Sequence, residues 1–379
     1  MRKLLDQKTI RKIDWLLLLN IVALVGFGLL SLTAAMASPA TGNEVTLSEK
    51  IANLNWGLVM RQAIWFVIGL VAMLLVMMID YTALRDAAPV IYWINVVILA
   101  LLYLLATVTK NTVSWYKFGS VGFQPSELMK ISLMLMLASM LAGRPQDQKI
   151  ETFQDLWKPA LIVLLPFLLV ALQPDMGTAM VLVCVAAGII FVVGLGKKIV
   201  LSLAGGLAVC LPVAWLLLSD MQKNRILVFF NSELDTSGAG YNVLRSKIAI
   251  GSGQVAGKGM FAEGHLSQLS WVPVKESDFI FSVTGETFGF IGGCILILLF
   301  GSLLYRTLRI ALRTRDRFGS LVVVGVASMI FIHAFENIGM TMGIMPVTGI
   351  PLPFVSYGGS NMLTNMIAYG LVLNIGSRW

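Results

Sequence analysis

Charged residues are scarce in this 379-residue sequence. Asp, Glu, Lys and Arg make up 13% of the residues, whereas hydrophobic residues make up 57%. A soluble domain has roughly 25% charged residues. The low charge therefore excludes a soluble globular protein and predicts an all-α polytopic membrane protein. Residues 1–379 are expected to form a single integral membrane domain, because the apolar runs leave no room for a soluble one.

Cysteine and histidine are also rare. The three cysteines, Cys184, Cys210 and Cys294, all lie in apolar runs. This placement favours small buried side chains over a disulfide framework or metal ligands. The two histidines, His265 and His333, are too few for a histidine-based metal site. The sequence therefore shows no dedicated metal motif.

Long apolar runs are the main feature that is present. A membrane-spanning helix needs ~20 mostly apolar residues. About ten segments qualify as spans: 14–36, 60–80, 89–109, 124–142, 159–173, 176–195, 198–219, 279–305, 318–341 and 357–376. One large polar loop, about residues 220–278, lies between the seventh and eighth spans.

Lys and Arg are distributed unevenly over the loops. Basic residues in short loops mark the cytoplasmic side, and 17 of the 28 fall on one side of the predicted topology. They are Arg2, Lys3, Lys8, Arg11, Lys12, Arg85, Arg144, Lys149, Lys158, Lys197, Lys198, Arg306, Arg309, Arg313, Arg315, Arg317 and Arg378. We expect both termini in the cytoplasm and the large loop outside. The net charge of +8 is thus a topology signal and predicts no nucleic-acid partner.

The unusual polar stretches fall on the predicted outer side. They are GFQPSELMK (122–130), LQPDMGTAM (172–180), KESDFIF (275–281) and MPVTGIPLPFVSYGGSN (345–361). The density of Pro and Gly in the last one breaks helices, so a re-entrant segment or a cavity rim is expected. The glycine-rich stretch IAIGSGQVAGKGM (248–260) lacks the strand–loop–helix context of a nucleotide site. A bond-forming reaction on the outer side has no ATP and must draw its energy from the substrate.

Several ionisable residues lie within or beside the predicted spans. Glu127 and Lys130 are three residues apart and share a helix face. Ionisable side chains within a membrane are energetically unfavourable and are usually functional. The alternative is that Glu127 and Lys130 form an ion pair that only fixes helix packing. Asp175 is either an N-cap of the sixth span or a binding residue. Glu286 and Glu336 are expected to bond to neighbouring helices.

Asp278 has the strongest claim to chemistry, because it lies where the eighth span leaves a loop rich in Lys and Arg. A general base must reach the proton it removes and must be ionised. Partial burial would raise the pKa of Asp278, whereas Lys130 or Lys275 would lower it, and the sequence leaves both outcomes open. The alternative is a helix N-cap for Phe279 onward.

Several motifs occur in one order along the chain. They include Gln124-Pro125-Ser126-Glu127, Gln173-Pro174-Asp175-Met176-Gly177-Thr178, Ser246-Lys247-Ile248-Ala249-Ile250-Gly251, Asp278-Phe279-Ile280-Phe281, Asn337-Ile338-Gly339-Met340 and Ser356-Tyr357-Gly358-Gly359-Ser360. Together they resemble the SEDS family (shape, elongation, division and sporulation), closest to its RodA branch. The resemblance implies an inverting peptidoglycan glycosyltransferase that polymerises lipid II on the outer face of the bacterial cytoplasmic membrane during cell elongation. It also implies a class B penicillin-binding protein transpeptidase and other elongation-complex membrane proteins as partners.

The resemblance also implies roles for individual residues. The essential acid of the family's large outer loop falls on Asp278, and the Glu and Lys of its fourth span fall on Glu127 and Lys130. One inversion needs one base, and polyprenyl pyrophosphate leaves as an anion, so paired carboxylates are not required. The predicted substrate-binding residues are Arg61, Lys117, Asp175, Arg225, Lys247 and Ser356. No cofactor is predicted beyond a divalent cation, Mg²⁺ or Mn²⁺, that could help to neutralise the pyrophosphate.

The sequence departs from the family pattern in places. Ser114 stands where an Arg is usual before Trp115, so Lys117 or Arg61 is expected to take over that role. Glu336 replaces an apolar residue. Two other functions stay open. One is a lipid II transporter, or flippase, motivated by the ionisable residues within the spans, and the other is a passive scaffold for the cross-linking partner.

Overall fold

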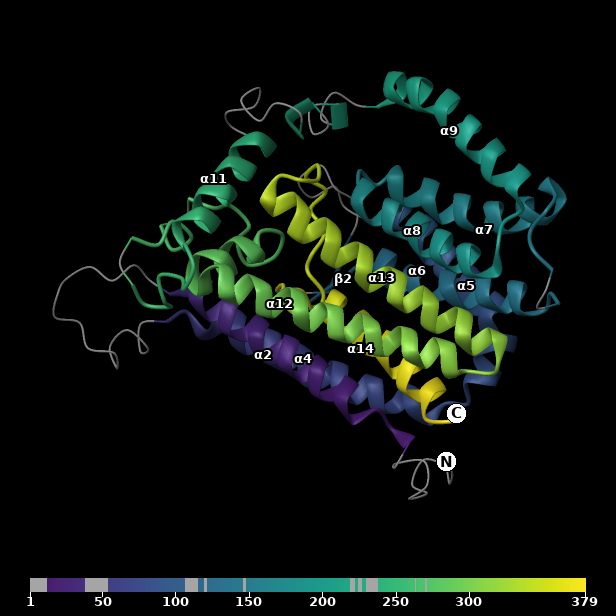
Figure 1. Ribbon diagram of the computed structural model, residues 1–379, viewed down its shortest axis with the longest axis horizontal. Helices are drawn as coiled ribbons and strands as arrows, with labels where there is room; N and C mark the ends of the chain where they lie inside the picture. The colour runs from purple at the N-terminus through teal and green to yellow at the C-terminus, as the bar shows by residue number, and fades with distance from the viewer. Residues whose placement is uncertain are drawn as a thin grey trace.

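The computed structural model describes residues 12–37, 54–105, 115–118, 121–145, 148–218, 222–223, 227–229, 238–262, 264–269 and 271–379. Ten long helices in these ranges form an elongated assembly (Figure 1). They are α2 (Trp15–Met36), α4 (Trp56–Met78), α5 (Tyr81–Leu105), α6 (Pro125–Ala142), α7 (Phe153–Ala171), α8 (Met176–Val193), α9 (Lys197–Leu217), α12 (Ile280–Arg313), α13 (Arg317–Met342) and α14 (Gly359–Gly376). Eight of them are long and apolar enough to cross a membrane, with α9 and α14 as the remaining two. The predicted all-α polytopic fold is confirmed.

Some predicted boundaries were wrong. The third span was predicted from residue 89, but α5 begins at Tyr81 and carries Pro89 inside it. The eighth span was predicted to end at residue 305, but α12 continues to Arg313. Hydropathy misses these helix ends because their polar residues extend beyond the apolar run while the backbone remains helical.

The large outer loop contains regular structure that the sequence did not predict. Its described part includes the helix α11 (Ala239–Ser252). A small antiparallel hairpin, formed by β1 (Tyr116–Phe118) and β2 (Val121–Phe123), comes directly before α6 in the sequence. The guanidinium of Arg245 lies 3.8 Å from the ring centre of Trp271, which attaches α11 to the segment that leads into α12.

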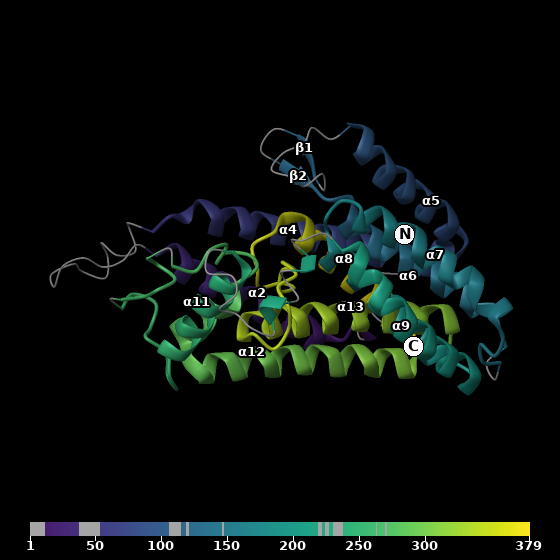
Figure 2. The ribbon, with the colours of Figure 1, turned by 90° about the horizontal axis from the view of Figure 1, so that it is seen from above.

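The helices pack in layers around α13 and α14. Viewed from above, α5 and α12 lie at opposite edges of the bundle and α13 lies between them (Figure 2). α14 is almost entirely buried and packs most extensively on α4. α14 contains three asparagines, which make it more polar than α4. The side-chain amide of Asn374 donates to the carbonyl oxygens of Val76 (2.8 Å) and Ile79 (2.6 Å).

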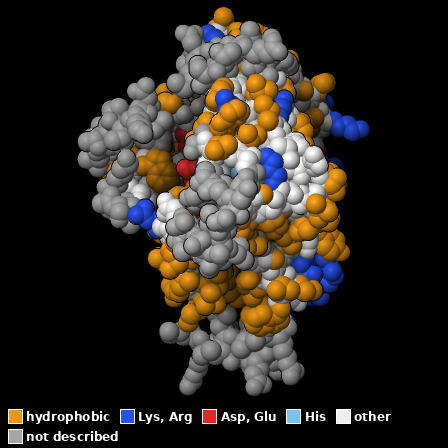
Figure 3. Space-filling view, turned by 90° about the vertical axis from the view of Figure 1, so that its left-hand side faces the viewer, with side chains coloured by type: hydrophobic (Ala, Val, Ile, Leu, Met, Phe, Trp, Pro, Cys, Tyr) orange, Lys and Arg blue, Asp and Glu red, His pale blue; other side chains and the backbone are white. Residues whose placement is uncertain are grey.

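α9 lies apart from the other long helices (Figure 1). Most of its described side chains are exposed, and Ile199 is its only buried hydrophobic residue among those described. Hydrophobic side chains also cover much of the surface in the end-on view of Figure 3, with Lys, Arg, Asp and Glu in small separate areas. Such an apolar periphery is what a bilayer environment requires.

The loops predicted to be cytoplasmic meet one another at one end of the bundle. Arg306 binds Asp14 across the ends of α12 and α2 (2.7 Å), and Arg378 binds Asp80 (2.7 Å). Arg144 pairs with Asp155, and Arg317 donates to the carbonyl oxygen of Arg144 (2.6 Å). Residues from the loops predicted to be outside also contact one another, since Gln124 bonds to Asp175 (3.1 Å) and to Ser360 (3.4 Å).

The glycine-rich stretch of the outer loop forms a backbone seam with α12. Four bonds make the seam: Lys258 N to Glu286 O, Gly259 N to Thr287 O, Phe290 N to Gln254 O, and Ile291 N to Val255 O, all 2.9–3.1 Å. α12 is kinked there, since Gly289 has φ 65° and ψ −161°. The loop residues therefore satisfy helix groups that the kink would leave without partners. The seam explains why this stretch is rich in glycine, and no bound nucleotide is needed to explain it.

Candidate functional site

The candidate site lies at the outer-loop end, where turns over residues 272–279 lead into α12. Asp278 is half-buried, and the hydroxyl of Ser277 donates to its Oδ1 (2.9 Å). The N-cap residue of α12 is Phe279, which makes no side-chain cap. The alternative interpretation of Asp278 as the helix N-cap is therefore wrong, and its carboxylate is held by the turn instead.

The backbone around Asp278 is fixed by two buried side chains. Asn337 on α13 donates from its amide to the carbonyl oxygens of Asp278 (2.9 Å) and Ile350 (2.7 Å). Ser356 is 2% exposed, and its hydroxyl donates to the carbonyl oxygen of Ser277 (2.6 Å) while it accepts from the N–H of Leu352 (2.8 Å). The Pro- and Gly-rich segment 345–358 is thus tied to the turn that carries the carboxylate.

The same segment lies directly against the carboxylate. Gly349 has φ 77°, and a Cβ placed on it would lie 3.3 Å from Oδ2 of Asp278. Tyr357 donates from its N–H to the carbonyl oxygen of Glu276 (2.9 Å). The segment forms a rim around the candidate site, which confirms the prediction that this irregular backbone is buried in protein or lines a cavity.

A cavity of about 500 Å³ opens beside this turn. Its polar lining comes from Arg61, Ser277 and Tyr357, and its other lining residues are Ile64, Trp65, Ile68, Trp115, Gly122, Gly358 and Gly359. The neighbour of Arg61, Gln62, is buried and ties α4 to the rim through Ser356 O (3.0 Å) and the N–H of Gly358 (3.1 Å). α4 therefore places a cation and an apolar wall next to the turn of Asp278.

The predicted pair of Glu127 and Lys130 is present and buried. The Lys130 ammonium lies 2.8 Å from Oε1 of Glu127 and 3.1 Å from Nε2 of His333 on α13. Nδ1 of His333 lies 2.7 Å from the carbonyl oxygen of Met329, which can only accept, so Nδ1 carries the proton. In a neutral His333, Nε2 is then the acceptor for Lys130.

This buried network lies close to the turn of Asp278. His333 and Asn337 are four residues apart on α13, and their Cβ atoms are therefore about 6 Å apart on one helix face. Asn337 holds the backbone of Asp278, whereas His333 holds Lys130. Among the described residues, Oε2 of Glu127 and Oδ1 of Asn337 are buried without a hydrogen-bond partner. Such atoms normally bind water or a ligand.

Of the other predicted site residues, Asp175 and Lys247 have side chains in the described part of the chain, and the contacts given for them are with residues other than Asp278. Asp175 is the N-cap of α8, accepting from the N–H of Thr178 (3.1 Å), and it also accepts from the amide of Gln124 (3.1 Å). Lys247 is exposed on α11, and its side chain lies against Gly343 at the end of α13. Lys117 lies in β1, but its side chain is outside the described part, as is the whole of Arg225.

Glu286 was predicted to bond to a neighbouring helix, and the hydroxyl of Ser252 at the end of α11 does donate to its Oε1 (3.4 Å). Its carboxylate is fully buried and accepts from the ammonium of Lys258 (2.9 Å) and the N–H groups of Leu266 (2.7 Å) and Ser267 (2.9 Å). All three belong to the outer loop. A buried carboxylate needs such donors, so Glu286 anchors the loop beside the backbone seam.

Sequence reasoning missed His333 and Gln62 as site residues. The signal for His333 was present, because His333, Glu336 and Asn337 form a polar face in an otherwise apolar span. Gln62 had a weaker signal, a lone amide next to Arg61 at the start of an apolar run. Among the described residues, no group of three or more His, Cys, Asp or Glu side chains could hold a metal ion.

Comparison with known proteins gives one consistent picture. The FtsW, RodA and SpoVE family model, described as a cell cycle protein, matches residues 15–378. The chain is 35% identical over 320 residues to the peptidoglycan glycosyltransferase MrdB of Escherichia coli K12, covering 84% of this chain and 85% of MrdB. It is 31% identical over 379 residues to a probable peptidoglycan glycosyltransferase FtsW of Geobacter metallireducens, covering 99% and 97% of the two chains.

The fold is shared with a solved relative. A chain of a peptidoglycan synthase complex, in which polymerization and crosslinking are coordinated, superimposes with a TM-score of 0.77 at 28% identity. The similarity covers 96% of this chain and 97% of that chain. With the family model spanning almost the whole sequence, this chain belongs to the SEDS family of FtsW, RodA and SpoVE.

Proposed function

We propose that this chain is a peptidoglycan glycosyltransferase that joins lipid II units into glycan strands on the outer face of the bacterial cytoplasmic membrane. One observation carries the proposal. The half-buried carboxylate of Asp278 is held on a rigid turn next to a cavity that contains Arg61 and an apolar wall. A lipid substrate with a charged pyrophosphate needs these three features together. The names of the relatives agree with this activity.

The proposed reaction uses Asp278 as the general base. Its carboxylate removes the proton from the acceptor sugar hydroxyl, whose oxygen attacks the anomeric carbon of the donor. The bond from that carbon to the pyrophosphate breaks with inversion, and polyprenyl pyrophosphate leaves with the electron pair. Because the turn is fixed by Asn337 and Ser356, the base does not have to be ordered during the reaction.

Cations would stabilise the leaving group. Arg61 is the described cation that lines the cavity, and its guanidinium suits two pyrophosphate oxygens. Lys130 would act from the buried network with Glu127 and His333. We assign Lys117, Asp175, Arg225 and Lys247 to substrate binding on the resemblance alone. A Mg²⁺ or Mn²⁺ ion would be held mainly by substrate phosphates, as is usual for these ions.

The apolar wall fits a polyprenyl chain. Ile64 and Ile68 line the cavity and are 54% and 43% exposed on the outer surface of α4. A chain lying on them would reach the bilayer without crossing protein. The likeness to a synthase complex supports a cross-linking partner, for which we propose a class B penicillin-binding protein. The role in cell elongation rests on the resemblance to the RodA branch.

The decisive experiment compares Asp278→Asn with the wild type as purified protein. The variant should bind lipid II in a pull-down but form no glycan chains on gels, because the amide cannot take the proton. Glu276→Gln is the matched control, since it removes a carboxylate two residues away in the same turn. Polymerisation by Asp278→Asn at the wild-type rate would refute the proposal.

A second function, transport of lipid II across the membrane, is favoured by the buried network of Glu127, Lys130 and His333. Ionisable groups within spans are typical of transporters. Liposomes with fluorescent lipid II separate the two functions. Transport is favoured over polymerisation if the wild type makes no polymer and Asp278→Asn translocates lipid II at the wild-type rate.

A further inference from the structure

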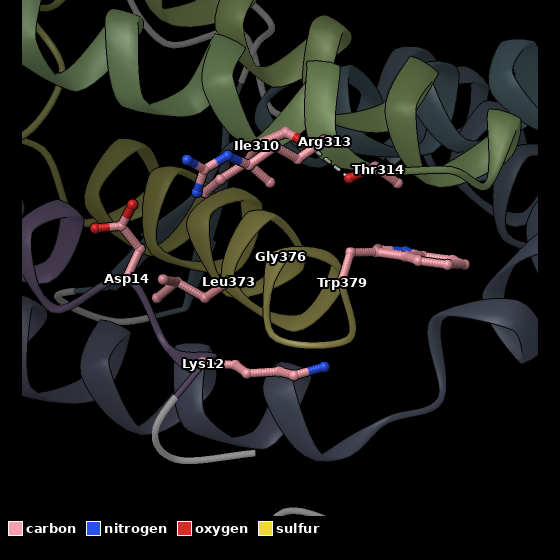
Figure 4. Close-up of a pocket in the computed structure, with 8 residues that line it drawn as sticks. All are labelled: Lys12, Asp14, Ile310, Arg313, Thr314, Leu373, Gly376 and Trp379. Atoms are coloured by element: carbon pink, nitrogen blue, oxygen red, sulfur yellow. Dashed lines mark hydrogen bonds between the residues drawn. The ribbon is translucent and has the colours of Figure 1, made fainter. Parts of the chain in front are cut away.

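A second cavity lies at the opposite end of the bundle from Asp278. Its volume is about 240 Å³, and it lies where α12 and α14 end and the chain enters α2 (Figure 4). The lining residues are Lys12, Asp14, Ile310, Arg313, Thr314, Leu373, Gly376 and Trp379. The lining thus combines two cations, one carboxylate, two aliphatic side chains and an indole ring.

The carboxylate of this cavity is already neutralised. Oδ1 of Asp14 accepts from the N–H of Leu17 (3.0 Å), which caps α2. The same oxygen accepts from Arg306 Nε (2.9 Å) and Nη2 (2.7 Å). Asp14 therefore has its own cation from outside the cavity lining, and it leaves the charges of the two lining cations uncompensated.

Those two cations are Lys12 and Arg313. Both are exposed, and among the described residues neither has a carboxylate within ion-pair distance. The last turn of α12 favours a cation because of the helix dipole, which accounts for one Arg there. It does not account for a second cation from the other side of a cavity. Two cations that line one small cavity favour the binding of an anion there.

The rest of the lining is apolar or amphipathic. Ile310 and Leu373 provide aliphatic surface, and Trp379, which also lines the cavity, is 47% exposed. Tryptophan prefers the boundary between lipid headgroups and acyl chains. Basic pockets between membrane helices on the cytoplasmic side bind anionic lipid headgroups. A phosphate ester attached to a glycerol and an acyl chain matches this lining better than a free inorganic ion, which has no use for the apolar part.

We propose that this cavity binds the phosphate headgroup of an anionic phospholipid in the cytoplasmic leaflet. Lys12 and Arg313 would contact the phosphate oxygens, and Ile310, Leu373 and Trp379 would contact the glycerol and the start of an acyl chain. The choice of leaflet rests on the orientation given under the proposed function. The site is distinct from the cavity near Asp278, because the two share no lining residue.

The test measures lipid binding to the purified full chain by native mass spectrometry. Phosphatidylglycerol is the probe, with phosphatidylcholine as the neutral reference and inorganic phosphate and glycerol phosphate as soluble anions. We expect the wild type to retain phosphatidylglycerol in preference to phosphatidylcholine. The double variant Lys12→Gln/Arg313→Gln should weaken this retention by about tenfold or more, which corresponds to about 1.4 kcal/mol.

Matched variants separate a site from general charge. Lys198→Gln/Arg309→Gln removes the same charge from the same end outside the cavity lining and should leave retention unchanged, as should Asp278→Asn. Lys12→Arg/Arg313→Lys keeps both charges and should retain the lipid, so it shows that loss is not misfolding. Three outcomes would overturn the proposal. The Gln double variant could retain the lipid as well as the wild type does, or the control pair could lose as much lipid as the Gln double variant. Millimolar inorganic phosphate alone could also displace the lipid. The experiment measures lipid binding and not polymerisation. A negative result here can therefore be told apart from a failure of the proposed glycosyltransferase function.

Discussion

At the scale of single residues, His333 is the residue that links the two halves of the candidate site. It accepts from Lys130, which also binds Glu127, and it lies one helical turn from Asn337. A neutral imidazole with its proton on Nδ1 offers Lys130 an acceptor without adding a second positive charge. His333 therefore acts as a positioning residue for the ammonium group.

We expect His333→Phe to impair both stability and polymerisation. Loss of one hydrogen bond to a buried charge costs roughly 1.5–3 kcal/mol, and an equal rise in the barrier would slow the reaction about tenfold or more. His333→Gln, whose side-chain oxygen can accept, should keep part of both. Thermal unfolding and glycan gels measure the two effects. A His333→Phe protein as stable and active as the wild type would contradict this role.

Lys275 gives a pH-dependent prediction. Burial lowers its pKa below the usual 10.5, in spite of nearby Glu276 and Glu286, and its ammonium donates to the carbonyl oxygen of Ser267 (2.5 Å). A base with a lower pKa in the folded state binds fewer protons there than in the unfolded state, so stability rises with pH between the lowered value and the unfolded one.

The wild type should therefore gain thermal stability relative to Lys275→Gln as pH rises towards about 10. Differential scanning of both proteins in one buffer series measures this difference. Lys247→Gln removes an exposed lysine from the same outer loop and serves as the control. A difference that stays flat or falls with rising pH would show that burial of Lys275 does not control the effect.

At the scale of elements, the backbone seam between the outer loop and α12 sets the shape of the loop. Gly257 has φ 82°, and a Cβ on it would lie 2.2 Å from the carbonyl oxygen of Thr287. Gly259 has φ 84° with nothing within 4 Å. The two glycines thus share a backbone conformation, but only Gly257 has a backbone carbonyl in the way.

Gly259→Ala should cost roughly 1–2 kcal/mol, the penalty for a left-handed L-residue. Gly257→Ala should cost clearly more, because it also separates the seam, and it should expose the loop to protease. Limited proteolysis and thermal unfolding of both variants test this comparison. Equal losses in the two variants would mean that close contact at Gly257 is unimportant.

The elements also show how far sequence reasoning reaches in this chain. Long apolar runs predicted the spans, because burial in lipid demands them, and the spacing of Glu127 and Lys130 predicted their ion pair. Lys130's second partner, His333, and the loop donors of Glu286 could not be predicted, because they come from residues far away in the sequence. The Pro- and Gly-rich segment 345–358 predicted a cavity rim. It did not predict that the buried Ser356 holds the turn of Asp278 by donating to the carbonyl oxygen of Ser277.

At the scale of the whole molecule, orientation in the membrane is the property that decides where each cavity works. The basic excess predicts that the end of the bundle that carries Arg306 lies in the cytoplasm. In a variant without the three native cysteines, Leu269→Cys should react with an impermeant maleimide in intact cells, whereas Arg315→Cys should react only after lysis. The reverse pattern would place both cavities on the opposite sides of the membrane.

The burial of α14 has a consequence for how the protein is made. α14 is not among the helices apolar enough to cross a membrane alone, and its Asn374 bonds to the carbonyl oxygens of Val76 and Ile79, almost three hundred residues earlier in the chain. It emerges from the ribosome after the other described long helices. A segment this polar inserts poorly by itself, so its entry depends on a slot that earlier helices have already formed. Assembly of the centre thus follows synthesis of the other described helices, and the rim around Asp278 is completed only then.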